Sequence, residues 1–479
     1  MSPPASPLPP PARTVVCKFG GTSLADADQL RKVRDIVRAD PARRVVVPSA
    51  PGKRFAEDRK ITDLLYVCHD AAVQGLSFGE AFGVVADRFR ELVAGLGLSV
   101  DLDGPLEAAR AGIAEHAAAG RGPDFAASRG EALNGPVVAA LLECPCIDAA
   151  EVIRFGVDGL LDAEATHARL IERLAGVERA VVPGFYGRGP DGHVRTFSRG
   201  GSDVTGAVVA RALHADVYEN WTDVPGLLMA DPRIVENPRP IGTLTYRELR
   251  ELSYSGATVL HPEATFPVRA AGIPVNIRST NEPDHPGTRI VDAADAEAGA
   301  GAGPGAGNEA ATKDDHGLAP PVITGIAGRT DFTVISLERE LMNEQVGYVE
   351  RVLGVFRRAG VSVEHVPSGI DTLSVVVADA ELGGRRDAVL DELARTGQTD
   401  RLEVDPDLAL IATVGRHMKT RPGMAATLFR ALADAAVNIR MIDQGSSELN
   451  IIVGVDVADY ETAVRAIYAA FVTSPPLDA

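Results

Sequence analysis

A segment rich in glycine, alanine and proline interrupts the chain and constrains its fold more than any other feature. It spans residues 292–321 and reads DAADAEAGAGAGPGAGNEAATKDDHGLAPP. A composition with so few large apolar side chains cannot form a hydrophobic core, so we expect a flexible linker here. The 479 residues also exceed what a single core usually organises. The sequence therefore predicts separate domains before and after this segment.

Before the linker, short apolar stretches alternate with segments of helical periodicity. Thr14–Lys18 predicts a strand, the apolar positions from Leu24 to Val37 predict a helix, and Arg44–Pro48 predicts the next strand. Further strands are expected at Cys146–Ala150, Ala180–Tyr186, Ala215–Tyr218 and Pro274–Ser279, and further helices at Phe78–Ala94, Leu106–Ala119, Phe125–Leu142, His167–Ala175, Tyr246–Leu252 and Gly256–Ala271. This order favours an α/β fold with a largely parallel sheet, in which Gly135-Pro136 could kink or split one helix.

After the linker, two segments of about 70 residues share one order of predicted elements: strand, helix, strand, strand, helix. The first copy has an additional leading strand, because Val322–Ala327 and Phe332–Leu337 both predict strands. The phrases VERVLGVFRRAGVSVEHV and AATLFRALADAAVNIRMI occupy matching places in the two copies. Their likeness predicts an internal duplication rather than two unrelated α+β units. Other strands are expected at Val361–Pro367, Thr372–Val377, Leu408–Val414, Asn438–Asp443 and Glu448–Val455, and helices at Gly347–Gly360, Arg385–Thr396, Gly423–Ala436 and Tyr460–Phe471.

Charge and composition exclude several classes of function. The net charge of −18 argues against nucleic acids and anionic membrane surfaces as partners, because both attract basic faces. No apolar run reaches the ~18 residues of a membrane span. Four dispersed cysteines indicate a reduced, cytoplasmic chain, and neither they nor the histidines form a metal-ligand cluster. Residues 1–13 are rich in proline and lack the order of a signal peptide, so a disordered leader is expected.

Polar and glycine residues gather where predicted strands end, which is the ligand-binding edge of an open parallel sheet. The stretch TFSRGGSDVTG, residues 196–206, places such residues at the start of a helix. Its glycines and unpaired N–H groups suit an anion. An ordinary tight turn, with Ser202 or Asp203 as the N-cap of the following helix, explains the same residues equally well. The full set is Lys18, Gly20, Gly21, Ser23, Ser49, Arg199, Ser202, Asp203, Thr222, Asp223, Asp231 and Arg233.

This set suits phosphoryl transfer, which needs donors along a phosphate chain, a fixed positive charge and a carboxylate. Glycine loops and Lys18 supply the first two, Asp203 could supply the third, and Arg199 offers a planar fork for a substrate carboxylate. The sequence has no GxxxxGK[ST] motif, so it is not a P-loop NTPase. No GxGxxG follows the first strand, which weighs against dinucleotide binding, and no nucleophile–base triad is visible.

Several motifs in order resemble the aspartate kinase pattern. They are KFGGTS at 18–23, RGGSD at 199–203, WTDVPG at 221–226, ADPR at 230–233 and VLHPEA at 259–264. The two C-terminal repeats resemble its paired ACT domains, including NIRMIDQGSSELNI at 438–451. The resemblance extends from Thr14 to Phe471 except for the linker. It implies a three-layer amino acid kinase fold at 14–291, the linker at 292–321, and two ferredoxin-like ACT domains at 322–400 and 401–479.

The resemblance also implies an activity and a role for each site residue. The chain would phosphorylate the β-carboxylate of L-aspartate with ATP and Mg²⁺, the first step toward lysine, threonine and methionine. Lys18 and Asp203 would serve catalysis. Aspartate would be bound by Ser49, Thr62, Glu131, Arg199, Gly201 and Ser202, and the nucleotide by Lys18, Gly20, Gly21, Ser23, Thr222, Asp223, Asp231 and Arg233. On local grounds alone, the charged cluster SRGE favours a solvated first turn of a helix over a functional role for Glu131.

In the family, ACT repeats bind an amino-acid effector, so feedback inhibition is implied. Lysine is the first candidate effector and threonine the second. Met342, Ser368 and Asp371 of the first repeat would form the effector site, although a hairpin turn with a solvent-facing Asp371 explains the motif equally well. Pairing of ACT domains further implies a homodimer or a higher homo-oligomer.

One position departs from the pattern and leaves room for other functions. Many aspartate kinases have a nucleotide-contacting lysine before VLHP, where this chain has Thr258. Arg278 could replace that cation, but a solvated strand end is the simpler interpretation. The substitution is the only support for a catalytically silent amino-acid sensor, and the retained Lys18 and Asp203 oppose it. A glutamate or acetylglutamate kinase is disfavoured by the ACT pair.

Overall fold

The computed structural model describes residues 13–198, 200–257, 260, 262–293, 296, 322–396 and 399–473, which form two compact units. The first unit contains the described residues up to Leu227, Pro240–Tyr246 and those between 259 and 319. The second contains Leu228–Arg239, residues 247–258 and the described residues from 320 onward. Apart from Arg13, 292, 293 and 296, the predicted leader and linker lie outside the described residues. No helix in the described part is long and apolar enough to cross a membrane.

The first unit contains a largely parallel sheet, as the alternation predicts. Among the described residues its strand order is β3-β2-β1-β6-β8-β9-β7, and only the β8–β9 pair is antiparallel. The strands are β1 (Val15–Phe19), β2 (Arg43–Pro48), β3 (Ala180–Val181), β6 (Val217–Thr222), β7 (Thr243–Thr245), β8 (Val275–Ser279) and β9 (Thr288–Val291). A hairpin of β4 (Tyr186–Arg188) and β5 (Val194–Thr196) leads into the TFSRGGSDVTG stretch.

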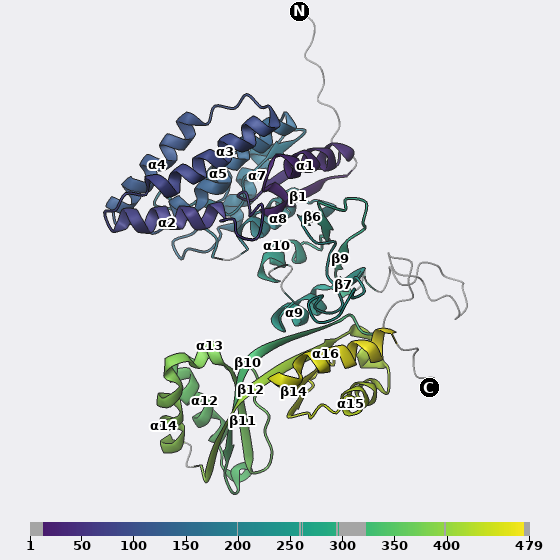
Figure 1. Cartoon of the computed structure of the whole chain (residues 1–479). Helices are drawn as coiled ribbons and strands as arrows, with labels where there is room; N and C mark the ends of the chain where they lie inside the picture. Colours follow the sequence, from purple (N-terminus) through teal and green to yellow (C-terminus); the bar gives the residue numbers. More distant parts are fainter. Residues whose placement is uncertain are drawn as a thin grey trace, which may run out of the picture. The chain divides into compact units, whose positions relative to one another are not determined.

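Helices cover both faces of this sheet and complete the three layers (Figure 1). They are α1 (Ala27–Ala39), α2 (Ile61–Val73), α3 (Gly79–Leu96), α4 (Asp103–Ala118), α5 (Asp124–Leu142), α6 (Ala149–Val152), α7 (Ala163–Leu174), α8 (Gly201–Ala212) and α10 (Phe266–Arg269). Side chains alternate along a strand, so Val15, Cys17 and Phe19 of β1 join one core with residues of α1–α5. The intervening Lys18 faces the side of α8, whose Asp203 it contacts. The alternation of β1 therefore aims one cation out of the core toward α8.

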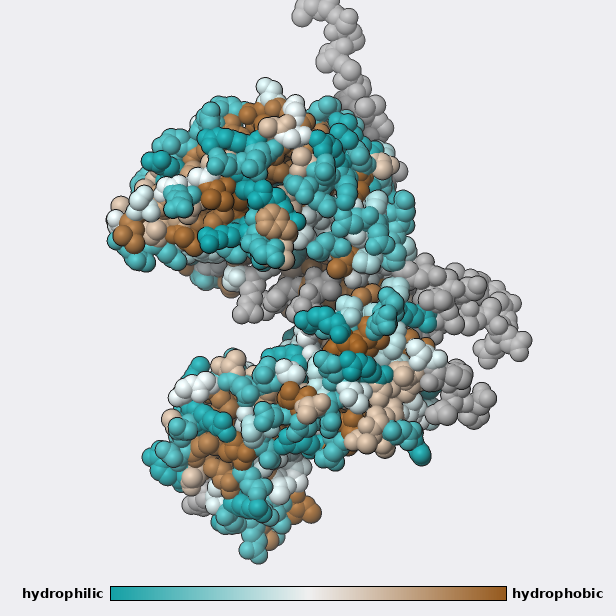
Figure 2. Space-filling model, viewed as in Figure 1, coloured by the Kyte–Doolittle hydropathy of each residue, from teal (hydrophilic) through white to brown (hydrophobic). Residues whose placement is uncertain are grey.

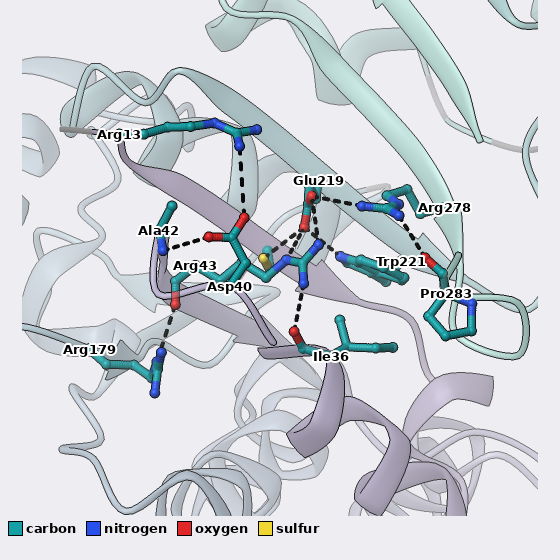
Figure 3. A network of polar contacts seen from close by, with 11 residues as sticks. Arg13, Ile36, Asp40, Ala42, Arg43, Arg179, Glu219, Trp221, Arg278 and Pro283 are labelled. Atoms are coloured by element: carbon teal, nitrogen blue, oxygen red, sulfur yellow. Dashed lines mark hydrogen bonds and ion pairs between the residues drawn. The ribbon is translucent and has the colours of Figure 1, made fainter. Parts of the chain in front are cut away.

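A buried polar network ties the core face of β1, β2 and β6 together (Figure 3). Glu219 of β6 is 3% exposed and accepts hydrogen bonds from Arg43 Nε at 2.8 Å, Trp221 Nε1 at 3.0 Å and Cys17 Sγ at 3.3 Å. Burial pushes the pKa of Glu219 upward, but the hydrogen bonds and charge of Arg43 outweigh it and lower the pKa overall. A charge buried in this way is stable because it is paired on several sides. The network ties β1, β2 and β6 together on the face of the sheet opposite to Lys18.

Arg278 of β8 belongs to the same network, which corrects its sequence interpretation. Its guanidinium lies 4.6 Å from the ring centroid of Trp221 and donates to Glu219 Oε1 at 3.3 Å. The side chain is 18% exposed, so it is neither a solvated strand end nor a free cation for a nucleotide. The sequence could not show this pairing, because it depends on β6 and β8 being neighbours.

Three other local predictions differ from the structure. Helix α5 runs unbroken through Pro136, so Gly135-Pro136 does not split it. Gly135 instead packs against Pro183, where no side chain would fit. Only Cys146 of the strand predicted at Cys146–Ala150 pairs, by an isolated bridge to Val181, because Asp148 accepts from the Ala150 N–H and begins α6. Of the helix predicted at Gly256–Ala271, the described part forms a 3-10 turn at Pro262–Thr265 followed by α10.

The second unit contains a five-stranded antiparallel sheet of order β11-β10-β12-β14-β13 among its described residues. Its strands are β10 (Gly325–Glu338), β11 (Thr372–Ala378), β12 (Arg401–Val414), β13 (Met441–Asp443) and β14 (Asn450–Asp456). Its helices are α9 (Tyr246–Tyr254, from Arg247 on), α12 (Tyr348–Ala359), α13 (Asp379–Leu382), α14 (Arg386–Thr396), α15 (Met424–Asp434) and α16 (Tyr460–Tyr468). Each copy contributes one 14-residue strand, and β10 pairs with β12. The duplicated pattern therefore forms one continuous sheet.

The first copy departs from prediction at two places. The two strands predicted at Val322–Ala327 and Phe332–Leu337 are one strand, because the chain passes through a bulge between Arg329 and Phe332. Asp331 there has a φ of 69°, so its polar stretch bends the strand without ending it. Residues 361–367 make only a few edge hydrogen bonds to β11 and form no strand.

Candidate active site

An ion pair lies where β1 ends. Lys18 Nζ is 2.7 Å from Asp203 Oδ1 and 3.5 Å from Asn220 Oδ1, and Asn220 Nδ2 donates to Asp203 Oδ1 at 2.8 Å. Lys18 is only 9% exposed, so this charge is largely removed from bulk water. Within the described residues, the ion pair with Lys18 and the hydrogen bond from Asn220 both meet Oδ1 of the Asp203 carboxylate. The arrangement presents a fixed cation beside a carboxylate that keeps one oxygen for another partner.

Helix α8 begins on glycine rather than on a polar cap. Gly200 is the N-cap residue with a φ of 57°, and no side chain caps the first turn. The interpretation of Ser202 or Asp203 as an N-cap is therefore wrong. Gly201 lies against Phe185, where an added Cβ would be 2.2 Å from Cδ2 of that ring. The glycines let the helix start close to the β3–β4 connection, which leaves Asp203 free to meet Lys18.

We predict that Gly206→Ala destabilises the protein although alanine favours helices. A Cβ at Gly206 would lie 2.6 Å from the ring of Tyr218, whose hydroxyl donates to the backbone oxygen of Asp203. Overpacking of this kind costs about 1–3 kcal/mol, more than the ~1 kcal/mol gained from helix propensity. Gly83→Ala in α3 is the matched control, since nothing lies within 4 Å of its Cβ position. Thermal unfolding should show a lower Tm for Gly206→Ala and an unchanged or higher Tm for Gly83→Ala; equal gains would contradict the packing argument.

The glycine loop after β1 lies against the loop after β2. Gly52 N donates to Gly21 O at 2.8 Å, and a Cβ on Gly52 would lie 2.5 Å from Gly21 C. Gly20 N donates to Trp221 O at 2.9 Å. Such close backbone approach requires glycine. Ser23, predicted to contact the nucleotide, is 1% exposed, and its hydroxyl accepts from Thr280 at 2.8 Å. The loops form one rim, with the Ser23 side chain turned into the protein.

Glu131 of α5 is buried beside this rim. Burial raises its pKa to about 8, although the nearby Ala50 backbone and the charges of Arg129 and Lys18 lower it in part. Its Oε2 is buried and has no hydrogen-bond partner among the residues that the structure describes. A buried carboxylate oxygen without a partner is costly unless a ligand supplies one. Glu131 is therefore not the solvated first-turn residue that its local sequence favoured.

The structure brings together most of the predicted residues of the first unit. Lys18, Asp203 and the two glycine loops lie at the carboxyl ends of β1, β2 and β6, with Glu131 beside them. Ser202 is 8% exposed and packs against Gly184. Thr62 is half-buried in the first turn of α2. Thr222 is the last residue of β6 and Asp223 follows it, and the Thr222 hydroxyl donates to Asp223 Oδ1 at 3.0 Å. Arg199 and Thr258 lie outside the described residues.

The remaining predicted residues belong to the second unit. Asp231 and Arg233 pair with each other at 2.6 Å, and the hydrogen bond from Arg233 lowers the pKa of Asp231. Met342 is buried in the core of the first repeat, whereas Ser368 and Asp371 are exposed. Asp371 Oδ1 accepts the Leu341 N–H at 2.9 Å, as expected of a turn residue. A role for these residues in binding a nucleotide or an effector stays a prediction.

Sequence reasoning missed two buried asparagines at the site. Asn220 contacts both members of the ion pair, and the only signal for it is the register that places β6 beside β1. Asn134 lies one turn after Glu131 and donates to Ser49 O at 2.8 Å, while its buried Oδ1 meets no partner within the described part of the chain. A spacing of three residues on one helix face could have indicated it.

Among the described residues, no group of three or more His, Cys, Asp or Glu side chains could bind a metal ion. A divalent cation at this rim would therefore take most of its ligands from a phosphate chain and from water, as Mg²⁺ commonly does.

Comparison with known proteins supplies a family. The amino acid kinase family matches residues 13–279, and an ACT domain matches residues 411–471. Aspartokinase 3 of Bacillus subtilis (strain 168) is 38% identical over 474 residues, which cover 95% of this chain and 98% of that protein. The crystal structure of Clostridium acetobutylicum aspartate kinase superposes with a TM-score of 0.85 at 46% identity, covering 95% of this chain and 100% of the other.

Two ligand-bound structures of one relative are also similar. E. coli aspartokinase III in complex with aspartate and ADP (R-state) superposes with a TM-score of 0.71 at 27% identity, covering 96% of this chain and 100% of the other. The same enzyme in complex with lysine and aspartate (T-state) gives a TM-score of 0.70 at 26% identity, covering 96% and 99%.

Proposed function

The chain belongs to the aspartokinases of the amino acid kinase family, and we propose which of its residues perform and regulate the reaction. As an aspartate kinase it transfers the γ-phosphoryl group of ATP to the β-carboxylate of L-aspartate, forming 4-phospho-L-aspartate and ADP. The observation that supports the residue assignment best is the buried Lys18–Asp203 ion pair at the sheet edge, with Glu131 nearby.

We assign Lys18 to the transferring phosphoryl group. An oxygen of the substrate β-carboxylate attacks the γ-phosphorus while the bond to the β,γ-bridging oxygen breaks, so ADP leaves with the electron pair. The nucleophile is already ionised, so positioning and charge neutralisation replace a strong general base. Lys18 supplies a fixed positive charge for the developing charge on the phosphoryl oxygens. Asp203 orients the ammonium group of Lys18 through its 2.7 Å contact.

We assign Glu131 to the substrate's ammonium group. Its partnerless buried oxygen supports this role, since an ammonium group supplies the donors that Oε2 lacks. The buried Asn134 Oδ1, which also lacks a partner, lies one turn further along α5. Aspartate binding would be completed by Ser49, Thr62, Arg199, Gly201 and Ser202.

ATP would lie along the glycine rim. The close-packed backbone of Gly20 and Gly21 supports phosphate contacts there, and Thr222 and Asp223 lie at the carboxyl end of the neighbouring strand β6. We propose that Mg²⁺ accompanies ATP, bound mainly by phosphate oxygens and water, and neutralises phosphate charge. Ser23, Asp231 and Arg233 stay predicted nucleotide contacts, and the cytoplasmic location stays a prediction.

A coupled ADP-release assay tests the activity and its substrate. We expect turnover with L-aspartate and at most a trace with glutamate or acetylglutamate. ATP consumption that is independent of aspartate would contradict the assignment, as would faster turnover with acetylglutamate.

We propose that lysine inhibits the enzyme through the ACT unit and that threonine is the second candidate. The T-state complex of the E. coli relative with lysine supports this choice. Exposed apolar side chains of the first repeat support a homodimer through the ACT domains: Leu341 (54%), Val346 (98%), Val349 (40%) and Ile370 (70%). Figure 2 shows hydrophobic patches on the part of the second unit that contains α12 and α14.

Lysine, threonine and both together should be titrated at sub-saturating aspartate. We expect lysine to inhibit and Asp371→Ala to weaken that inhibition without changing uninhibited turnover. Sedimentation should give a dimer or larger assembly that Val346→Asp dissociates. Inhibition by threonine alone would reassign the effector, and a monomer would contradict the proposed interface.

A further inference from the structure

Asn220 is a buried side chain that contacts both partners of the proposed catalytic ion pair. It is 5% exposed and lies in β6, where the parallel register places it beside Lys18 of β1. Adjacent residues in β6 point to opposite faces of the sheet. Asn220 therefore faces α8 with Lys18, while its neighbour Glu219 pairs with Cys17 on the core face.

The side-chain amide suits both contacts in only one orientation. Its Nδ2 donates to Asp203 Oδ1 at 2.8 Å, and its Oδ1 accepts from Lys18 Nζ at 3.5 Å. The flipped amide would place oxygen against the carboxylate and nitrogen against the ammonium, so neither hydrogen bond could form. The amide of Asn220 thus offers a donor to the carboxylate of Asp203 and an acceptor to the ammonium group of Lys18.

This matching gives the carboxylate a defined direction. Lys18 Nζ and Asn220 Nδ2 both meet Oδ1 of Asp203, which restricts rotation of the carboxylate. The network around Glu219 fixes the other face of the same strand, with Arg43, Trp221 and Arg278 as its donors (Figure 3). Asn220 is therefore presented from a strand whose position is set by contacts on the opposite face.

We propose that Asn220 is a positioning residue for phosphoryl transfer, which acts by holding Asp203 and Lys18 in the geometry the transfer requires. This inference rests on the catalytic roles proposed for Lys18 and Asp203. Asn220 itself need not touch either substrate, so its loss should lower kcat much more than it raises KM. A residue with only a structural role would lower stability and leave kcat per folded molecule unchanged.

Asn220→Ala and Asn276→Ala form a matched pair for the test. Asn276 lies in the adjacent strand β8 and pairs in register with Glu219, so it faces the opposite side of the sheet. For Asn220→Ala we expect kcat to fall about 10- to 100-fold, the effect of losing a hydrogen bond to a charged group. KM for ATP and for aspartate should change by less than about threefold. Asn276→Ala should keep the kcat of the unmodified enzyme.

The folded fraction can be measured independently of activity. Trp221 is the chain's single tryptophan, is fully buried and adjoins Asn220, so its fluorescence reports local folding. If Asn220→Ala does not fold, the Asn220→Asp variant tests the proposal in its place. Aspartate keeps the shape of the asparagine side chain but places a carboxylate against the carboxylate of Asp203. For that variant we again expect a kcat at least about tenfold lower.

The results separate this inference from the site assignment. A folded Asn220→Ala or Asn220→Asp with kcat within about threefold of normal, beside inactive Lys18→Met and Asp203→Ala, would overturn the role of Asn220 alone. Equal losses of kcat in Asn220→Ala and Asn276→Ala would show an effect of general packing and would also overturn the proposed role of Asn220. Full activity in Lys18→Met and Asp203→Ala would refute the proposed site, and the role of Asn220 with it.

Discussion

Lys18→Met is expected to lower kcat by about 1,000-fold or more, because it removes the fixed positive charge that faces the transferring phosphoryl group. Methionine retains most of the apolar stem of lysine, and Lys18 is 9% exposed, so packing should survive. Asp203 would keep its hydrogen bond from Asn220 at 2.8 Å. The loss should therefore be one of catalysis rather than of folding.

The measurement is steady-state turnover with saturating ATP and aspartate, accompanied by thermal unfolding. Lys32→Met is the control, since this lysine of α1 is exposed and donates to Asn281 Oδ1 at 2.8 Å. It should keep normal turnover. A Lys18→Met enzyme that retains a tenth or more of the activity would place the phosphoryl site elsewhere.

Glu131→Gln is expected to raise KM for aspartate about 10- to 100-fold, the cost of losing a hydrogen bond between charged groups. The unmodified enzyme should also show a pH dependence. With a pKa of about 8, Glu131 is mostly neutral at pH 7, and it becomes the anion that an ammonium group requires as the pH rises. KM for aspartate should therefore fall by up to about tenfold per pH unit between pH 6 and 8.

Initial rates against aspartate concentration, measured from pH 6 to 9, test both statements. The glutamine variant should lose the pH dependence of KM, because its side chain does not ionise. Glu107→Gln on the exposed side of α4 should behave as the unmodified enzyme. An aspartate KM that is flat with pH, or that rises toward pH 8, would contradict the role of Glu131 as the ammonium ligand.

Local pattern was sufficient for the fold class and for the residues at strand ends. The strand–helix alternation predicts the largely parallel sheet of the first unit, and the duplicated segments predict two similar repeats in the second unit. Lys18 ends a predicted strand, the glycine loops follow predicted strands and Asp203 begins a predicted helix, and the carboxyl ends of parallel strands share an edge. These features depend on residues close together in the sequence.

What the sequence could not supply depends on register between distant strands. Asn220 and Lys18 are 202 residues apart and meet only because β6 lies beside β1. The interpretation of Arg278 as a solvated strand end is wrong for the same reason, since its partner Glu219 lies in the neighbouring strand β6. The bulge in β10 likewise depends on the pairing of β10 with β12, which the polar residues Arg329 to Asp331 do not reveal.

The central claim is that aspartate lies between Glu131 and Lys18 at this edge of the sheet. A crystal structure of the enzyme with aspartate and ADP tests it most directly. We expect the ammonium group of aspartate at hydrogen-bond distance from the Glu131 carboxylate, about 3 Å, with its β-carboxylate directed toward Lys18 Nζ. Aspartate bound elsewhere with Glu131 uncontacted, or ADP phosphates remote from Lys18 and the glycine loops, would contradict it.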